Sequence, residues 1–183
     1  MKREFLRLTL ALTAVTAATA LLLGAANAVT ADRIAQRQEE ARQAAMQAVL
    51  PDARDFEPLS GAPDAVRAVY AARSGDTLCG YVVETAASGF GGEIAVTVGV
   101  LPDGTVAGVE ITSHAETAGL GARCTENGFL SQFAGLSAGF GVSKTGASGN
   151  AIDAISGATV TSKAVAGAVN AAIGAAAQMG GLS

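Results

Sequence analysis

The chain has 183 residues, of which 50% are hydrophobic and only 15% are charged, and its net charge is −4. An acidic chain without tryptophan lacks the basic surface and the stacking aromatic residues that nucleic-acid binding needs. Two cysteines and one histidine are too few for a four-ligand Cys/His zinc site, a cysteine-ligated iron–sulfur cluster or a disulfide-rich scaffold. Any redox chemistry must therefore come from an organic cofactor or from elsewhere.

The hydrophobic excess is concentrated near the N-terminus, where residues 8–31 contain no charged side chain. A helix of this length exceeds the about 20 residues that cross the hydrocarbon core of a bilayer. The segment before it carries Lys2, Arg3 and Arg7, and basic residues flank membrane spans on the cytoplasmic side. We therefore expect a cytoplasmic N-terminus at residues 1–7, a transmembrane helix at residues 8–31 and an extracytoplasmic remainder.

A cleaved signal peptide is the alternative interpretation of the same segment. Its apolar region would be residues 8–23, and Ala26-Asn27-Ala28 fits the small residues of a cleavage site. A buried core helix is disfavoured by the length of the segment and by its basic flank. Both the anchor and the signal peptide export the rest of the chain.

Residues 32–50 predict a second helix, because they are rich in alanine, glutamine, glutamate and arginine. Asp32 can cap the first turn of this helix, and Pro51 ends it. We interpret residues 32–59 as a helical stalk or linker and residues 60–183 as one extracytoplasmic domain.

A series of short strands follows the stalk. Alternating apolar and β-branched side chains predict strands at residues 66–71, 78–83, 93–100 and 105–112, which together form an antiparallel meander. A short helix is predicted at residues 129–136 and a long alanine-rich helix at residues 161–179. Strands followed by a terminal helix predict an α+β fold, in which a twisted antiparallel sheet packs with helices and the transmembrane helix precedes them.

Two segments carry the candidate chemistry, and the first is the loop at residues 114–121. This loop places His114, Glu116 and Thr117 beside glycines directly after a predicted strand, and such loops often form ligand sites. Taken alone, His114 is more often a hydrogen-bonded structural residue, and Glu116 is more often a solvated carboxylate. The loop is therefore a weak signal by itself.

The second segment, residues 153–163, contains four hydroxyl side chains and Lys163 where the last helix is predicted to begin. Free N–H groups at a helix N-terminus attract phosphate, and a lysine in the first turn adds positive charge. Simple N-capping would need one hydroxyl rather than four. The glycine spacing fits neither a Walker P-loop nor a dinucleotide-binding fingerprint.

The run Ser156-Gly157-Ala158-Thr159-Val160-Thr161-Ser162 resembles the flavinylation motif of the FMN-binding domain family, and the loop at residues 114–121 resembles the second signature of that family. Between and around them, in the expected order, lie Gly80-Tyr81, Gly89-Phe90-Gly91-Gly92, Asp103-Gly104 and Gln132-Phe133. With its N-terminal segment, the chain is similar to the G subunits of Rnf ion-translocating electron-transport complexes and to the related C subunits of sodium-translocating NADH:quinone reductases. Such subunits are usually anchored, which favours the anchor over the signal peptide.

The resemblance implies that a flavin transferase moves FMN from FAD onto Thr159 and joins it there through a phosphoester. It also implies that Asp153 assists the transfer and that Glu116, Thr117 and Leu120 line the isoalloxazine ring. The complete set of expected cofactor-binding residues is His114, Glu116, Thr117, Leu120, Asp153, Ser156, Gly157, Ala158, Thr159, Thr161 and Lys163. The family usually has proline where this chain has Ala118, so the loop lacks one backbone restraint.

The resemblance further implies an electron-transfer subunit in the cell membrane with no independent catalysis and no metal. Its partners would be the other subunits of a complex that couples ferredoxin oxidation and NAD reduction to ion translocation. One alternative is a stand-alone exported reductase with covalent FMN, and another is a flavin-free binding or scaffold module. Cys79 and Cys124 could form a disulfide outside the cell or remain two thiols.

Overall fold

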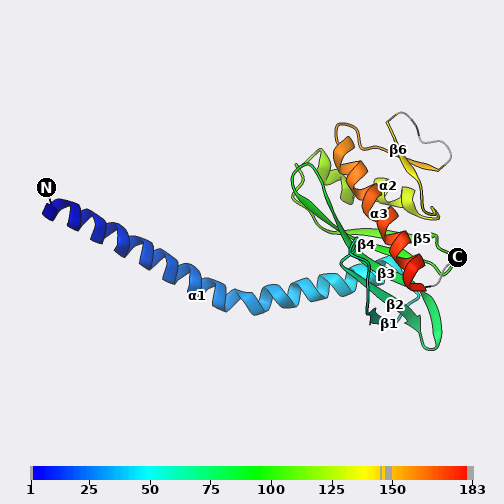
Figure 1. The fold of residues 1–183 in the computed structure, drawn as a ribbon, viewed down its shortest axis with the longest axis horizontal. Helices are drawn as coiled ribbons and strands as arrows, with labels where there is room; N and C mark the ends of the chain where they lie inside the picture. The colour runs from blue at the N-terminus through cyan, green and yellow to red at the C-terminus, as the bar shows by residue number, and fades with distance from the viewer. Residues whose placement is uncertain (1, 145, 147–149, 181–183) are drawn as a thin grey trace. The chain divides into compact units, whose positions relative to one another are not determined.

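The computed structural model describes residues 2–144, 146 and 150–180. The chain divides into two compact units, Met1–Ala41 and Arg42–Ser183. Helix α1 (Lys2–Val49) makes up the first unit and continues into the second, and the second unit also holds the sheet and the other helices (Figure 1).

Helix α1 runs without a break through both of the helices that the sequence predicts. No proline or glycine lies between Gly24 and Pro51, so nothing in the backbone ends a helix before Asp32. Asp32 lies inside α1 and does not cap an N-terminus. The predicted boundary between an anchor helix and a stalk helix is therefore absent from the secondary structure.

The part of α1 in the first unit has an apolar surface. The leucines at residues 8–23 are 66–75% exposed within the chain. The hydroxyls of Thr13, Thr16 and Thr19 each donate a hydrogen bond of 2.8–3.0 Å to the backbone carbonyl four residues earlier. Such internally bonded hydroxyls suit a lipid environment, and α1 is long and apolar enough to cross a membrane.

Five strands form one sheet whose spatial order follows the chain: β1 (Asp55–Leu59), β2 (Ala68–Ser74), β3 (Thr77–Ser88), β4 (Glu93–Val100) and β5 (Val106–Ser113). Every neighbouring pair is antiparallel, which confirms the predicted meander. The sequence patterns do not predict β1, because this edge strand contains Pro58 and buries none of its side chains fully.

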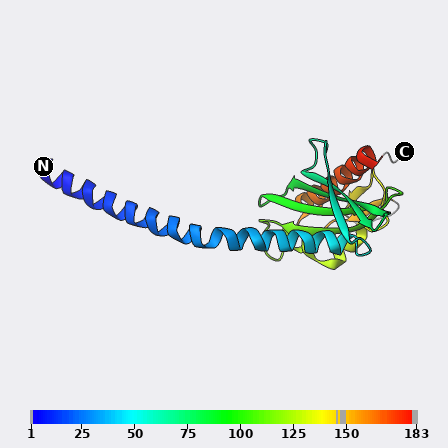
Figure 2. The same ribbon diagram turned by 90° about the horizontal axis from the view of Figure 1, so that it is seen from below.

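The two faces of the sheet are covered by different helices. Helix α3 (Thr159–Gly180) packs on one face, where Val83 and Val98 join Val165 in the main core. The last turn of α1 packs on the other face, where Val49 joins Val82 in a second cluster. Figure 2 shows the sheet between these two helices. This arrangement confirms the α+β class.

Close contact between α1 and the sheet depends on a missing side chain. A Cβ atom at Gly99 would lie 2.5 Å from the carbonyl oxygen of Val49. Arg42 holds the same end of the helix, because its guanidinium pairs with Glu84 at 2.5 Å and lies 5.1 Å above the ring centroid of Tyr70. Residues 42–49 are thus part of the folded domain.

Short elements connect β5 to α3. They are the 3-10 turns η1 (Gly121–Thr125) and η2 (Ser131–Phe133), helix α2 (Asn127–Leu130), and strands β6 (Gly141–Ser143) and β7 (Ala151–Asp153). The helix predicted at residues 129–136 is therefore shorter and begins earlier. Strands β6 and β7 form a parallel pair that three-residue patterns cannot predict.

Helix α3 begins at Thr159, two residues before the predicted start, so Thr159 opens the helix. The apolar composition of α3 would also allow it to cross a membrane, but 56% of its most apolar stretch is buried within the domain, as expected of a core helix.

Cys79 and Cys124 are both free thiols, and burial raises the pKa of the Cys124 thiol.

Candidate functional site

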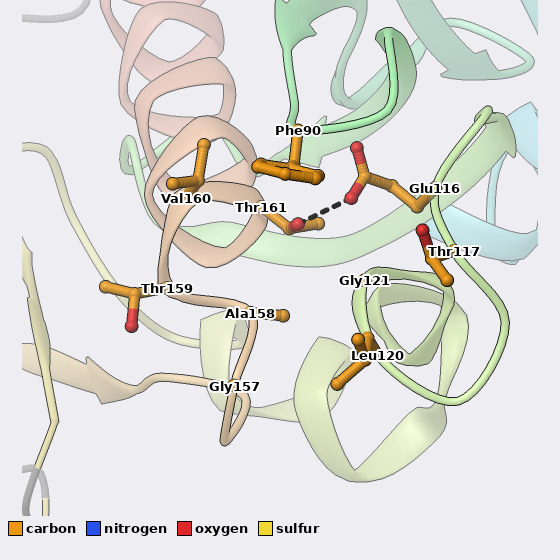
Figure 3. Close-up of a pocket in the computed structure, with 10 residues that line it drawn as sticks. All are labelled: Phe90, Glu116, Thr117, Leu120, Gly121, Gly157, Ala158, Thr159, Val160 and Thr161. Carbon is orange, nitrogen blue, oxygen red and sulfur yellow. Dashed lines mark hydrogen bonds between the residues drawn. The ribbon is translucent and has the colours of Figure 1, made fainter.

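A pocket of about 360 Å³ lies where three segments of the second unit meet (Figure 3). The β3–β4 loop, the loop after β5 and the first turn of α3 each contribute to its walls. The lining residues are Phe90, Glu116, Thr117, Leu120, Gly121, Gly157, Ala158, Thr159, Val160 and Thr161. The two segments that the sequence singles out are thereby brought to one site.

Among the described residues that line this pocket, Glu116 alone is charged, and it is just 9% exposed. Its Oε2 atom accepts a hydrogen bond of 2.7 Å from the hydroxyl of Thr161, and its Oε1 atom accepts one of 2.8 Å from the backbone N–H of Gly91. Desolvation raises the pKa of Glu116, but these hydrogen bonds outweigh it and hold the pKa below its usual value. The buried carboxylate is therefore ionised at neutral pH.

Glycines make room for this carboxylate. A Cβ atom at Gly89 would collide with Oε1 of Glu116, and one at Gly121 would collide with Oε2. A Cβ atom at Gly91 would collide with the carbonyl oxygen of Ala115. Gly89, Gly91 and Gly121 are thus required by the close packing around Glu116, whereas Gly119 has open space around it and a φ of 77° that favours glycine.

The turn that leads into α3 is tied by Ser162. The hydroxyl of Ser162 accepts a hydrogen bond of 2.9 Å from the N–H of Ile155 and donates one of 3.0 Å to the carbonyl of Ala158. Gly157 has a φ of 78°, in the left-handed region that favours glycine. Ser162 and Gly157 together fix the backbone conformation of the turn that positions Thr159.

Thr159 is half-buried at the N-terminus of α3 and lies at one edge of the pocket, with Glu116 at the other (Figure 3). Within the described part of the chain, its hydroxyl has no hydrogen-bond partner. The first N–H groups of a helix also lack partners within the helix. An unbonded hydroxyl and free donors therefore meet at this edge of the pocket.

Four of the residues predicted to bind the cofactor do not line the pocket. His114 accepts a hydrogen bond of 3.2 Å at Nδ1 from the N–H of Glu116, so it supports the loop. Asp153 is exposed at the end of β7, and its N–H donates to the side chain of Gln132 at 2.7 Å. Ser156 and Lys163 are also exposed, on the turn and in the first part of α3.

The pocket has an apolar rim, of which sequence reasoning named Leu120 but missed Phe90 and Val160. Phe90 is 78% exposed, Val160 is 53% exposed and Leu120 is 48% exposed. Figure 3 shows Phe90 and Leu120 on opposite sides of the pocket. A group of large, exposed apolar side chains is typical of a binding site. In the sequence, the aromatic residue between glycines at residues 89–92 could have indicated this rim.

Comparisons with known proteins agree with this geometry. The FMN-binding domain family matches residues 89–174, which include the whole pocket. The G subunit of the proton-translocating ferredoxin:NAD(+) oxidoreductase complex of Clostridium ljungdahlii is 36% identical over 84% of this chain and 81% of its own. The G subunit of the Na(+)-translocating ferredoxin:NAD(+) oxidoreductase complex of Acetobacterium woodii is 35% identical over 91% of this chain and 89% of its own.

A solved structure shares the fold. The C subunit of the Na(+)-translocating NADH-quinone reductase of Parabacteroides distasonis has a TM-score of 0.62 at 20% identity, over 82% of this chain and 97% of the other. The architecture and the pocket define a small α+β binding domain that follows an apolar helix. The chain belongs to the FMN-binding domain family, and the relatives described above are G subunits of ion-translocating oxidoreductase complexes. Helix α1 and these relatives indicate a membrane protein.

Proposed function

We propose that this protein is an electron-transfer subunit of an ion-translocating ferredoxin:NAD oxidoreductase complex and that it carries FMN joined by a phosphoester to Thr159. Its relatives are named as G subunits of such complexes, which supports the role in electron transfer and the association with other subunits. The family match supports FMN as the cofactor.

The position of Thr159 is the main observation that supports covalent attachment of FMN to this residue. Its hydroxyl borders the pocket at the first residue of α3 and has no hydrogen-bond partner in the described part of the chain. The free N–H groups of this helix end are suited to phosphate oxygens, and Lys163 adds a positive charge in the first part of the helix.

Attachment requires a flavin transferase that uses FAD. The Thr159 oxygen forms a bond to the phosphorus of the FMN half of FAD while the pyrophosphate bond breaks. AMP leaves, and the hydroxyl proton passes to the transferase or to solvent. Asp153 and Ser156 are exposed near the turn, so both are accessible to such an enzyme.

The isoalloxazine ring fits between the two sides of the apolar rim. Phe90 and Leu120 offer apolar surfaces from opposite sides, and Glu116 and Thr117 offer polar groups. His114 acts indirectly, by holding the backbone of the loop. Bound FMN supplies one- and two-electron chemistry, while the protein orients the ring and leaves it open to redox partners.

We extend the proposal to the topology. Residues 1–7 lie in the cytoplasm, residues 8–31 cross the membrane, residues 32–41 form the stalk, and the extracytoplasmic flavin domain begins at residue 42, earlier than the predicted residue 60, because the end of α1 and strand β1 are part of its fold. The basic N-terminal flank supports this orientation. A covalent link has a physical advantage outside the cell, because a cofactor bound by contacts alone would be lost by dilution.

Intact-mass measurement of the full chain, purified from membranes that contain a flavin transferase, tests the proposal. We expect the wild-type mass to increase by one FMN less one water, and we expect Thr159→Ala to lose this increase completely. Thr125→Ala is the matched control, because Thr125 is exposed, bonds only to Ala122 and lies outside the pocket. Retention of FMN by Thr159→Ala would overturn the assigned attachment site.

The stand-alone reductase differs from electron relay in what the purified protein does. A reductase would oxidise or reduce a small substrate over many turnovers by itself. A relay subunit would accept and release electrons only once per flavin unless its partner subunits are present. Turnover assays on the purified, flavin-loaded protein separate the two functions.

A further inference from the structure

We infer that the Glu116 side chain is a fixed negative charge beside the flavin ring and that it lowers the reduction potential of the bound flavin. The inference rests on the proposed function, because it assigns a role to one residue of the proposed FMN site. It goes further by stating how the protein sets the energy at which this carrier accepts electrons.

Glu116 is held in place by hydrogen bonds from neutral groups. Its two carboxylate oxygens accept them from the Thr161 hydroxyl and the Gly91 N–H. None of the ion pairs found among the described residues involves Glu116, and the attraction of nearby His114 is the weakest of the influences that lower its pKa. The negative charge is therefore stabilised mainly by dipoles and is not cancelled by a paired cation.

The carboxylate of Glu116 is packed closely against the backbone of two loops. Glycines stand against both carboxylate oxygens, and any larger residue at Gly89 or Gly121 would collide with them. The hydroxyl of Thr161 comes from the first turn of α3, the same turn that presents Thr159. The carboxylate and the attachment point are thus connected through the first turn of α3.

The sign of the effect follows from electrostatics. Reduction adds electrons to the ring, and the added negative charge is repelled by a fixed anion that borders the same pocket. This repulsion is strong where water is largely excluded, and solvent at the open rim weakens it. Removing the charge must therefore make reduction easier.

Redox titration of the full, flavin-loaded chain tests the inference, with the potential read from the flavin absorbance. We expect Glu116→Gln, which keeps the shape and removes the charge, to favour reduction at least tenfold, an upward shift of about 59 mV for a one-electron step. Glu116→Asp, which keeps the charge, should stay close to the wild-type potential. Glu126→Gln is the matched control, because Glu126 is exposed and lies outside the pocket.

An unchanged or lowered potential in Glu116→Gln would overturn the inference. Intact mass is measured first, so that wild-type protein without FMN counts against the proposed function rather than against the role of Glu116. If Glu116→Gln does not fold or load, redox-difference infrared spectra of wild-type protein with ¹³C-labelled glutamate decide the question. We expect the carboxylate bands of glutamate to shift on reduction, and unchanged bands would overturn the inference as well.

Discussion

Glu116 is the residue on which the geometry of the site depends most. The β3–β4 loop, the loop after β5 and the first turn of α3 all meet at its carboxylate, through Gly91, Gly121 and Thr161. The hydrogen bonds hold the pKa of Glu116 below its ordinary value despite the opposing effect of desolvation. A lowered pKa in the folded state links the charge of this residue to the stability of the domain.

The link predicts a pH dependence of stability. Because the folded pKa of Glu116 is depressed, its contribution to the free energy of unfolding is complete above the unfolded pKa of about 4.3 and is lost as the pH falls through the folded pKa. Replacing Glu116 with Gln should therefore destabilise the domain most near neutral pH and progressively less below about pH 4. Urea unfolding of the full chain in detergent micelles, at about pH 7 and about pH 3.5, measures this difference.

Glu126→Gln again serves as the control for this measurement, because the Glu126 side chain is 55% exposed and pairs only with Arg123. We expect its effect on stability to be small at both pH values. A difference between Glu116→Gln and wild type that stays constant with pH would contradict the link.

Single residues also show how far the sequence could predict the site. The two motifs correctly name the loop and the turn that meet at the pocket, because motif residues are local. Phe90 and Val160 are missed as lining residues, since their place depends on contacts between segments far apart in the chain. Lys163 and Asp153 lie beside the pocket segments but outside its walls, because a motif does not say which side of a turn each side chain occupies.

Among the elements, the turn before α3 depends on one hydroxyl. Ser162→Ala would leave the N–H of Ile155 without its acceptor in a buried place, and an unsatisfied buried donor costs about 1–3 kcal/mol. The same change should loosen the backbone that presents Thr159 and lower the fraction of chains that carry FMN. Chemical unfolding and intact mass measure the two effects.

Ser131→Ala is the control for the turn, because Ser131 is exposed on η2 and outside the pocket. It should change neither stability nor FMN content. Equal stability of Ser162→Ala and wild-type protein would show that the turn is held by other contacts.

The predicted elements succeed where the side chains alternate and fail where they do not. In β4, Ile94 and the valines alternate with smaller side chains, β5 alternates from Val109 to Thr112, and both strands are found at nearly the expected residues. Strand β1 is polar and lies at an edge, and β6 and β7 are too short to show a period. The predicted start of α3 is two residues too late, because the small residues at this helix end show no clear hydrophobic periodicity.

For the whole molecule, the structure predicts where the domain can be cut. A chain that begins at Arg42 keeps the end of α1, whereas a chain that begins at Pro51 loses Met46, Val49 and Leu50 from the second core cluster. Burial of each such side chain stabilises a domain by about 1.5–3 kcal/mol. We therefore expect the shorter chain to be less stable by at least about 3 kcal/mol, as measured by urea unfolding.

The longer fragment is the control for the shorter one, since it should unfold at the same urea concentration as the domain of the intact chain. Equal stability of the two fragments would contradict the role of α1 in the fold. The sequence alone did not predict this role, because residues 42–49 look like the rest of a solvated stalk and only the glycines of the sheet, such as Gly99, make room for them.

The open apolar rim at Phe90 has a consequence for selectivity between electron acceptors. A flavin ring in a pocket that is open to solvent can pass electrons to a docked protein without a conformational change. The same opening admits dioxygen, which takes electrons from reduced flavins without needing to be recognised. With FMN bound as proposed, protection of the reduced flavin would then require the surface of a neighbouring subunit over the rim, so that assembly of the complex would be needed to direct electrons to the correct acceptor.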